Sequence, residues 1–156
     1  MQTELAHMSK IAIRTANPQE WQNIQEIRRV VFQEEQGVDP ALEFDGKDEV
    51  AQQMIAYLDT QPVGTARIRY LDAETAKIER LAVLSIARGQ GIGKRLMQKA
   101  IELATEKKMQ EVVIHAQAYI KALYQQLGFI QEGETFDEAG IPHVKMRKKL
   151  TNNECD

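Results

Sequence analysis

The residues of this chain with the clearest chemical meaning lie between Arg88 and Lys94, in the run Arg-Gly-Gln-Gly-Ile-Gly-Lys. This run follows the apolar segment 81–83 and precedes an amphipathic segment that begins near Ile92. A strand that turns into a helix leaves several backbone N–H groups unpaired, and the helix dipole adds partial positive charge there. The three glycines let the backbone take positive φ and let a ligand approach closely. The run therefore predicts a cradle for a phosphate-bearing ligand.

Two common phosphate motifs do not fit this run. A P-loop would need Gly five positions before Gly93 and Ser or Thr after Lys94, but Arg88 and Arg95 stand at those places. A dinucleotide-binding G-x-G-x-x-G pattern fails because its third glycine is missing from either possible start. What remains is the pattern R-x-x-G-x-G, which needs its surroundings to be interpreted.

Composition places the chain among ordinary globular proteins. Its 156 residues, 43% hydrophobic and 28% charged, predict one domain over residues 10–150, with a flexible extension at 1–9 and a tail at 151–156. A net charge of −3 argues against nucleic acid as a partner. The single cysteine, Cys155, cannot form a disulfide within the chain, and no long apolar segment suggests a membrane. We therefore expect a cytoplasmic protein.

The first half of the chain predicts a strand, a helix, an acidic loop and a three-stranded meander. Apolar residues alternate over residues 10–15, and helical spacing runs from Pro18 to about Gln33. The loop 33–49 carries seven carboxylates and one lysine, and a short second helix could form in it. Strands are expected at 53–59, 63–71 and 76–83, with a hairpin turn at Gln61 and Pro62.

The second half predicts two helices and three strands. An apolar stripe defines a major helix from Ile92 to about Lys108, followed by a strand at 112–116 and a short helix that ends at Gly128. Strands at 129–131 and 143–150 close the chain, separated by a turn at 137–140.

This order of elements resembles that of the GNAT acetyltransferase superfamily, and the R-x-x-G-x-G pattern resembles its pyrophosphate loop for acetyl-coenzyme A. Further motifs in the right order indicate a bacterial branch whose acceptors are mostly unassigned: Val31-Phe32-x-x-Glu35-Gln36, Glu79-Arg80-Leu81-Ala82-Val83, Ala116-Gln117-Ala118, Leu123-Tyr124-x-x-Leu127-Gly128-Phe129 and Gly140-Ile141-Pro142-His143. The resemblance implies one α/β (α+β) domain, with a mixed, mostly antiparallel central sheet flanked by helices.

The resemblance also implies which residues bind acetyl-coenzyme A, the expected cosubstrate. The strand before the loop would pair with the pantetheine arm and offer a backbone N–H to the oxyanion. The expected donor-binding residues are Leu81, Ala82, Val83, Arg88, Gly89, Gln90, Gly91, Ile92, Gly93, Lys94, Gln117 and Tyr124.

Two residues carry the expected chemistry of acetyl transfer to an amine. In the family pattern Tyr124 faces the coenzyme A sulfur, where a phenol that stays protonated can protonate the departing thiolate. Glu79 stands where related enzymes use a glutamate as general base, although it could instead pair with Arg80 or Lys77.

The acceptor side is less defined. Glu34 and Glu35, at the acceptor-side loop, are candidate substrate-binding residues, and the acidic loop would favour a cationic amine unless it is merely solvated. His115 could act as a base, but a lone histidine on a strand is more often structural; His143 is expected to order a turn. No pair of histidines has the spacing of metal ligands, so no metal is expected.

The sequence thus predicts an acetyl-coenzyme A-dependent N-acetyltransferase acting on a primary amine of a small molecule, with a homodimer as an open possibility. Two alternatives remain. A glucosamine-phosphate N-acetyltransferase would need a cationic pocket, which the acidic loop disfavours, and a non-catalytic acyl-coenzyme A-binding module would not need Tyr124.

Overall fold

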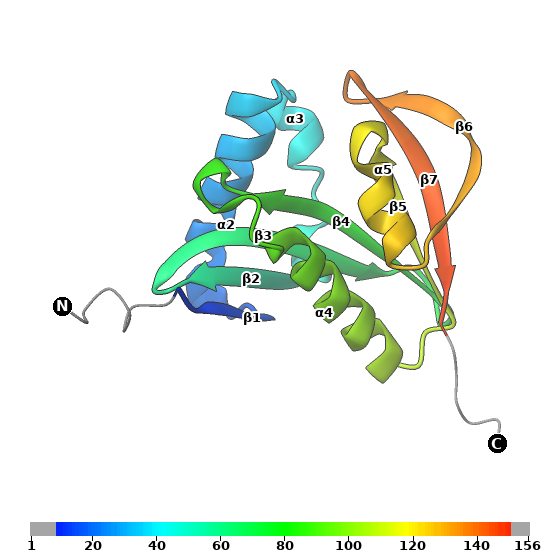
Figure 1. The fold of residues 1–156 in the computed structure, drawn as a ribbon, viewed down its shortest axis with the longest axis horizontal. Helices are drawn as coiled ribbons and strands as arrows, with labels where there is room; N and C mark the ends of the chain where they lie inside the picture. The colour runs from blue at the N-terminus through cyan, green and yellow to red at the C-terminus, as the bar shows by residue number, and fades with distance from the viewer. Residues whose placement is uncertain (1–8, 151–156) are drawn as a thin grey trace.

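The computed structural model describes residues 9–150, so most of the expected N-terminal extension and the C-terminal tail lie outside the described residues. Seven strands form one sheet in the order β1-β2-β3-β4-β5-β7-β6, in which only β4 and β5 are parallel neighbours (Figure 1). The strands are β1 (Ile11–Thr15), β2 (Gln52–Leu58), β3 (Gln61–Tyr70), β4 (Thr75–Val83), β5 (Glu111–Gln117), β6 (Ile130–Glu138) and β7 (Ile141–Lys149). The predicted mixed, mostly antiparallel sheet is confirmed.

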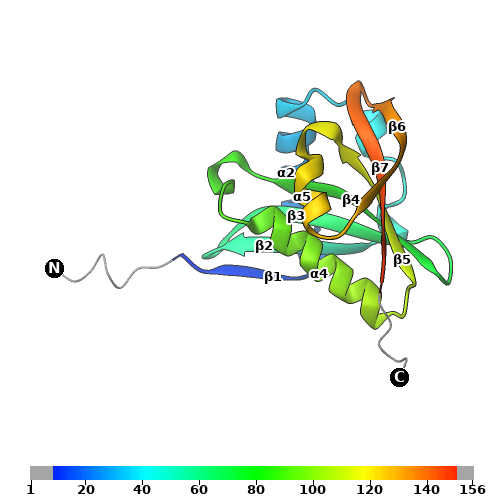
Figure 2. The same ribbon diagram turned by 45° about the vertical axis from the view of Figure 1, so that its right-hand side comes forward.

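Helices cover both faces of the sheet (Figures 1 and 2). The α-helices are α2 (Trp21–Arg28), α3 (Pro40–Glu43), α4 (Ile92–Glu106) and α5 (Lys121–Gln126). The buried stripe of α4, including Leu96 and Ala100, packs into the main core with Ile68 and Ile78 of the sheet. On the other face, Ile27 of α2 belongs to a smaller cluster with Ala82.

The first helical region consists of three consecutive helix types, 3-10, α and π. It begins as a 3-10 turn (Pro18–Glu20), where the Asn17 N–H donates to the Glu20 carboxylate at 3.0 Å. It continues as α2 and ends as a π-helix (Arg29–Glu35), two residues beyond the predicted end. The π turn places Val31 and Phe32 in the cluster that contacts Ala82 of β4.

Two sequence predictions about the strands were wrong. The β2–β3 turn lies at Asp59 and Thr60, where aspartate tolerates the φ of +57°. Pro62 lies inside β3 opposite Tyr57, at a shift of register where its missing N–H is not needed. The β6 strand is also far longer than the predicted 129–131, because its polar residues and its bulge hide the alternation of a strand.

A bulge in β4 orients the strand that leads to the glycine-rich loop. Arg80, at φ +58°, and Leu81 together lie opposite Ala66 of β3. Ile78 faces the α4 core before the bulge, whereas Leu81 packs on that core after it and Ala82 faces α2. The extra residue therefore reverses the side-chain alternation at the point where β4 reaches the candidate site.

Candidate active site

The sheet splits between β4 and β5. The two strands pair only at Thr75↔Glu111, Ala76↔Val112 and Lys77↔Val113, so residues 78–83 of β4 have no strand partner on that side. A cavity of about 340 Å³ lies at this split. It is lined by residues of both strands, the loop 36–47, α5 and the β6–β7 turn. The splitting strands diverge toward the top of Figure 1.

The glycine-rich loop has the backbone geometry that its sequence predicts. Gly89 and Gly91 have φ of +82° and +80°, and Gly91 is the N-cap of α4. Among residues 9–150, the N–H groups of 89–94 donate to no backbone carbonyl outside the helix, and the first three residues of α4 have no acceptor within it. A Cβ built on either of these glycines meets no atom within 4 Å, so space lies open before the amides. These residues fit a pyrophosphate group.

Gly93 brings the start of α4 onto the end of β4. A Cβ at Gly93 would lie 3.9 Å from Val83 and 4.0 Å from Leu81, which is ordinary contact. The unpaired edge of Leu81, Ala82 and Val83 thus leads directly from the loop into the cavity. An extended, amide-bearing ligand could add to that edge as a strand would, and the docking of a pantetheine arm there stays a prediction.

The charged residues of the loop are exposed. Arg88 donates from Nε to the Val83 carbonyl at 2.9 Å and from Nη2 to the Glu35 carboxylate at 2.5 Å. Lys94 and Gln90 are exposed beside it, whereas Ile92 is buried in the core. A phosphate at the loop would have to compete with Glu35 for Arg88.

Tyr124 of α5 lies in the cavity wall and is 5% exposed. Its ring meets that of Phe129 edge to face at 6.2 Å. Burial raises the pKa of its phenol, so the hydroxyl stays protonated at neutral pH. Within residues 9–150 no hydrogen bond holds this hydroxyl, which leaves it free to donate to a ligand.

The predicted base, Glu79, lines the cavity but is held by two arginines. Its carboxylate accepts from Arg67 Nη2 at 2.8 Å and from Arg69 Nε at 2.6 Å. Burial alone would raise its pKa, yet these hydrogen bonds outweigh burial and lower the pKa. Glu79 therefore holds an extra proton poorly.

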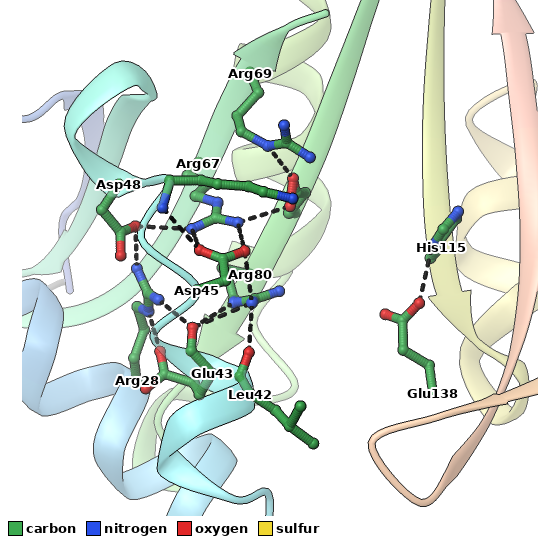
Figure 3. A network of polar contacts seen from close by, with 12 residues as sticks. Arg28, Leu42, Glu43, Asp45, Asp48, Arg67, Arg69, Arg80, His115 and Glu138 are labelled. Carbon is green, nitrogen blue, oxygen red and sulfur yellow. Dashed lines mark hydrogen bonds and ion pairs between the residues drawn. The ribbon is translucent and has the colours of Figure 1, made fainter.

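Glu79 belongs to a larger network that we call the arginine wall (Figure 3): Arg28, Glu43, Asp45, Asp48, Arg67, Arg69, Glu79 and Arg80. Arg28 and Arg67 are fully buried, and Glu43 is bonded to Arg28. Asp45 binds Arg67 at 2.6 Å, and Asp48 binds Arg28 at 2.6 Å. Three carboxylates of the acidic loop thus neutralise arginines of the protein itself, so they do not form the expected surface for a cationic acceptor.

Glu34 and Glu35 are absent from the cavity lining. Glu34 pairs with Arg29 at the protein surface, and Glu35 pairs with Arg88. Their contact with the acceptor stays a prediction, although the structure shows Glu35 nearer to the donor loop. Gln117, a predicted donor residue, lines the cavity and exchanges hydrogen bonds with the Gln36 side chain, the shorter at 2.9 Å.

The opposite side of the cavity, which we call the histidine wall, consists of His115, Glu138 and His143. His115 Nδ1 lies 2.9 Å from Glu138 Oε1, and the two are drawn to the right in Figure 3. His143 Nδ1 donates to the Ile141 carbonyl at 2.7 Å, and its Nε2 lies 3.9 Å from Glu138 Oε2. The β5–β7 register, with Gln117 opposite His143, brings these residues together. Sequence reasoning missed the pairing of His115 with Glu138, which are 23 positions apart.

The split sheet with a glycine-rich loop at its opening is the architecture of an acyl-coenzyme A acyltransferase. The family model described as "Acetyltransferase (GNAT) domain" matches residues 18–150. The chain therefore belongs to the GNAT acetyltransferase family and is an acyltransferase, which confirms the resemblance found in the sequence.

Relatives and solved structures agree with this assignment. YyaT of Bacillus subtilis is 41% identical over 130 residues, which cover 81% of this chain and 87% of YyaT. An acyl-CoA N-acyltransferase from Pseudomonas aeruginosa is 29% identical with a TM-score of 0.76, covering 90% of this chain and 99% of that one. A GNAT family acetyltransferase from Elizabethkingia anophelis with acetyl-CoA bound shares the fold, with a TM-score of 0.69, 21% identity, and coverage of 90% and 98%. Among residues 9–150, no helix has the length and apolar character needed to cross a membrane.

Proposed function

We propose that the protein transfers an acetyl group from acetyl-coenzyme A to a primary amine of a small molecule. The observation that carries this proposal is the continuous path from the unpaired amides at the start of α4, along the open edge of β4, to the cavity beside Tyr124. A thioester held along this path would present its carbonyl inside the cavity.

Donor docking uses backbone groups more than side chains. The amides of 89–94 would receive the pyrophosphate oxygens, and Leu81 to Val83 would receive the amide-bearing arm. Acetyl-coenzyme A supplies the acetyl group as an activated thioester. A β4 backbone N–H near the bulge can stabilise the oxyanion, because that edge has no strand partner.

Tyr124 acts as the general acid in this proposal. Its raised pKa keeps the proton on the hydroxyl, which can therefore donate a hydrogen bond to the sulfur as negative charge develops on the departing thiolate. The burial of the Tyr124 side chain places this hydrogen bond in surroundings less polar than bulk water, which strengthens it.

The amine must lose a proton, and two cavity groups can accept it. Glu79 is the candidate from sequence, but its two arginine partners make it a weak base. We favour His115, because histidine is the side chain suited to proton transfer near neutral pH and its ring is held at the cavity by the contact of Nδ1 with Glu138 at 2.9 Å. Glu79 then contributes fixed negative charge and wall structure.

The direct test removes the Tyr124 hydroxyl. Tyr124→Phe should lower kcat by about 10²- to 10⁴-fold and leave the Kd of coenzyme A nearly unchanged, measured by free-thiol release and calorimetry. Tyr70→Phe is the matched control, since the Tyr70 hydroxyl donates to the Gln52 side chain at 2.8 Å and does not line the cavity formed by the described residues. Unchanged turnover in Tyr124→Phe would assign Tyr124 to packing.

The donor path has its own test. Gly91→Val should weaken coenzyme A binding, because valine disfavours the φ of +80° and would cover the open space before the amides. Arg88→Ala should weaken it less, since Arg88 already pairs with Glu35. Binding of coenzyme A without thiol release for any amine would identify a non-catalytic acyl-coenzyme A-binding module instead.

A further inference from the structure

Lys77 lines the cavity, and neither the arginine wall nor the histidine wall forms an ion pair with it. Lys77 is the last residue of β4 that pairs with β5, and it is half-buried in the cavity lining. Among residues 9–150 its ammonium makes no salt bridge and no hydrogen bond, and the same holds for Lys47, which also lines the cavity. Arg69 uses only its Nε, on Glu79, so its two terminal nitrogens remain available within the described chain.

The salt bridges show which charges of the cavity lack a partner. The arginine wall is balanced, since each of its four arginines has a counterpart among its four carboxylates. Lys77 and Lys47 are the cavity-lining cations that no salt bridge within residues 9–150 engages. Together with the terminal nitrogens of Arg69, which lies opposite Lys77 in the β3–β4 register, they provide a local group of unengaged cationic donors.

A half-buried ammonium without a partner is unfavourable, and burial lowers the pKa of Lys77 for that reason. Glu79 and Glu138 attract it, whereas Arg69 and Lys47 repel it. An anion from a ligand would relieve this repulsion and satisfy the free N–H groups of both Arg69 and Lys77.

We propose that the acceptor amine carries an anionic group, a carboxylate or a phosphate, and that Lys77, Arg69 and Lys47 form the subsite that binds it. This inference rests on the proposed function. Lys77 lies opposite Arg69 and Leu81 lies opposite Ala66, so the two are three strand positions apart, or roughly 10 Å. The anion and the amine of the acceptor therefore lie at opposite ends of the molecule and not on neighbouring atoms.

The kinetic test uses pairs of acceptors in which one member carries an anionic group that the other lacks. Thiol release is measured with aminohexanoate against aminohexanamide, and with glucosamine phosphate against glucosamine. The anionic member of at least one pair should have a kcat/KM about tenfold higher, and which pair responds distinguishes carboxylate from phosphate. Lys77→Gln should remove this preference through KM and leave the KM of acetyl-coenzyme A unchanged. Lys99→Gln, on α4 and paired with Glu102, is the matched control.

A second test measures binding of the acceptors directly, so it can support or overturn the subsite even when no thiol is released. The same four compounds are titrated calorimetrically into the protein saturated with coenzyme A, with wild type beside Lys77→Gln. Tighter binding of an anionic member, lost in Lys77→Gln, supports the subsite even if no thiol is released, in which case the proposed function alone fails. Equal affinity within both pairs, or absence of binding by all four compounds, overturns the subsite.

Discussion

The two walls of the cavity hold charge in opposite ways. The arginine wall buries Arg28 and Arg67 completely and pairs every arginine with at least one carboxylate, while Arg28 and Arg80 also donate to backbone carbonyls. The histidine wall holds a single close polar pair, in which the His115 side chain is 29% exposed and that of Glu138 is 42% exposed. A closed network resists a change of protonation, because each proton gained would break an ion pair, whereas an open pair can gain and release one. We therefore infer that the arginine wall mainly maintains the shape of the cavity, and we propose that the histidine wall takes part in proton transfer.

The largest expected effect breaks the arginine wall. Glu43→Ala leaves Arg28 buried without its carboxylate, and this should lower the free energy of unfolding by about 3–5 kcal/mol in urea denaturation. Glu26→Ala is the control, since the pair of Glu26 with Arg29 is exposed to solvent and its loss should change the free energy of unfolding far less. Equal losses in the two variants would contradict the role assigned to burial.

The second prediction concerns which wall accepts the proton. His115→Gln should lower kcat/KM by about 10²-fold or more and change the shape of its dependence on pH between about 6 and 9, with the Kd of coenzyme A unchanged. Glu79→Gln should keep the shape of that profile and lower mainly the stability, because Arg67 and Arg69 lose a partner. The reverse pattern would place the base on the arginine wall, as the sequence first suggested.

The smallest effect is the acid sensitivity of the arginine wall. Burial would raise the pKa of Asp45, but the Arg67 hydrogen bond and others lower it well below its ordinary value. A carboxyl whose folded-state pKa is depressed contributes stability that is complete above its unfolded pKa and is lost as the pH falls. The free energy of unfolding should therefore decrease from pH 5 to pH 3. In Asp45→Asn this decrease should be smaller by an amount on the order of 1 kcal/mol, and an unchanged slope would speak against the assignment.

Local patterns predicted most of the fold. The period of α4 is visible in the sequence because this helix buries one face, whereas β2 and β3 appear as short apolar runs because consecutive residues are buried. The glycine-rich loop is a contiguous signal. The turn at Asp59 and the length of β6 were missed. The turn was misplaced because a proline usually marks a turn, whereas Pro62 lies within β3. The length of β6 was missed because β6 is a polar edge strand with a bulge.

The site was harder to predict, because its walls join residues that are distant along the chain. Arg67 and Arg69 share a face of β3 by the period of two, which could have indicated partners for the acidic loop. No local sequence pattern predicts the contact between His115 and Glu138. The two residues meet because β7 pairs with β5 and so brings the β6–β7 turn beside it. Nor could the sequence show that the loop carboxylates turn inward.

The narrow parallel join between β4 and β5 has a mechanical consequence. Three paired positions connect the half-sheet β1–β4 to the half-sheet β5–β7, with α4 and α5 packed beneath them. A ligand that contacts both half-sheets stabilises the state in which β4 and β5 are paired. Its binding free energy therefore opposes local separation of these two strands. Amide hydrogen exchange at Ala76 and Val112 would then report occupancy of the cleft, although neither residue needs to contact the ligand.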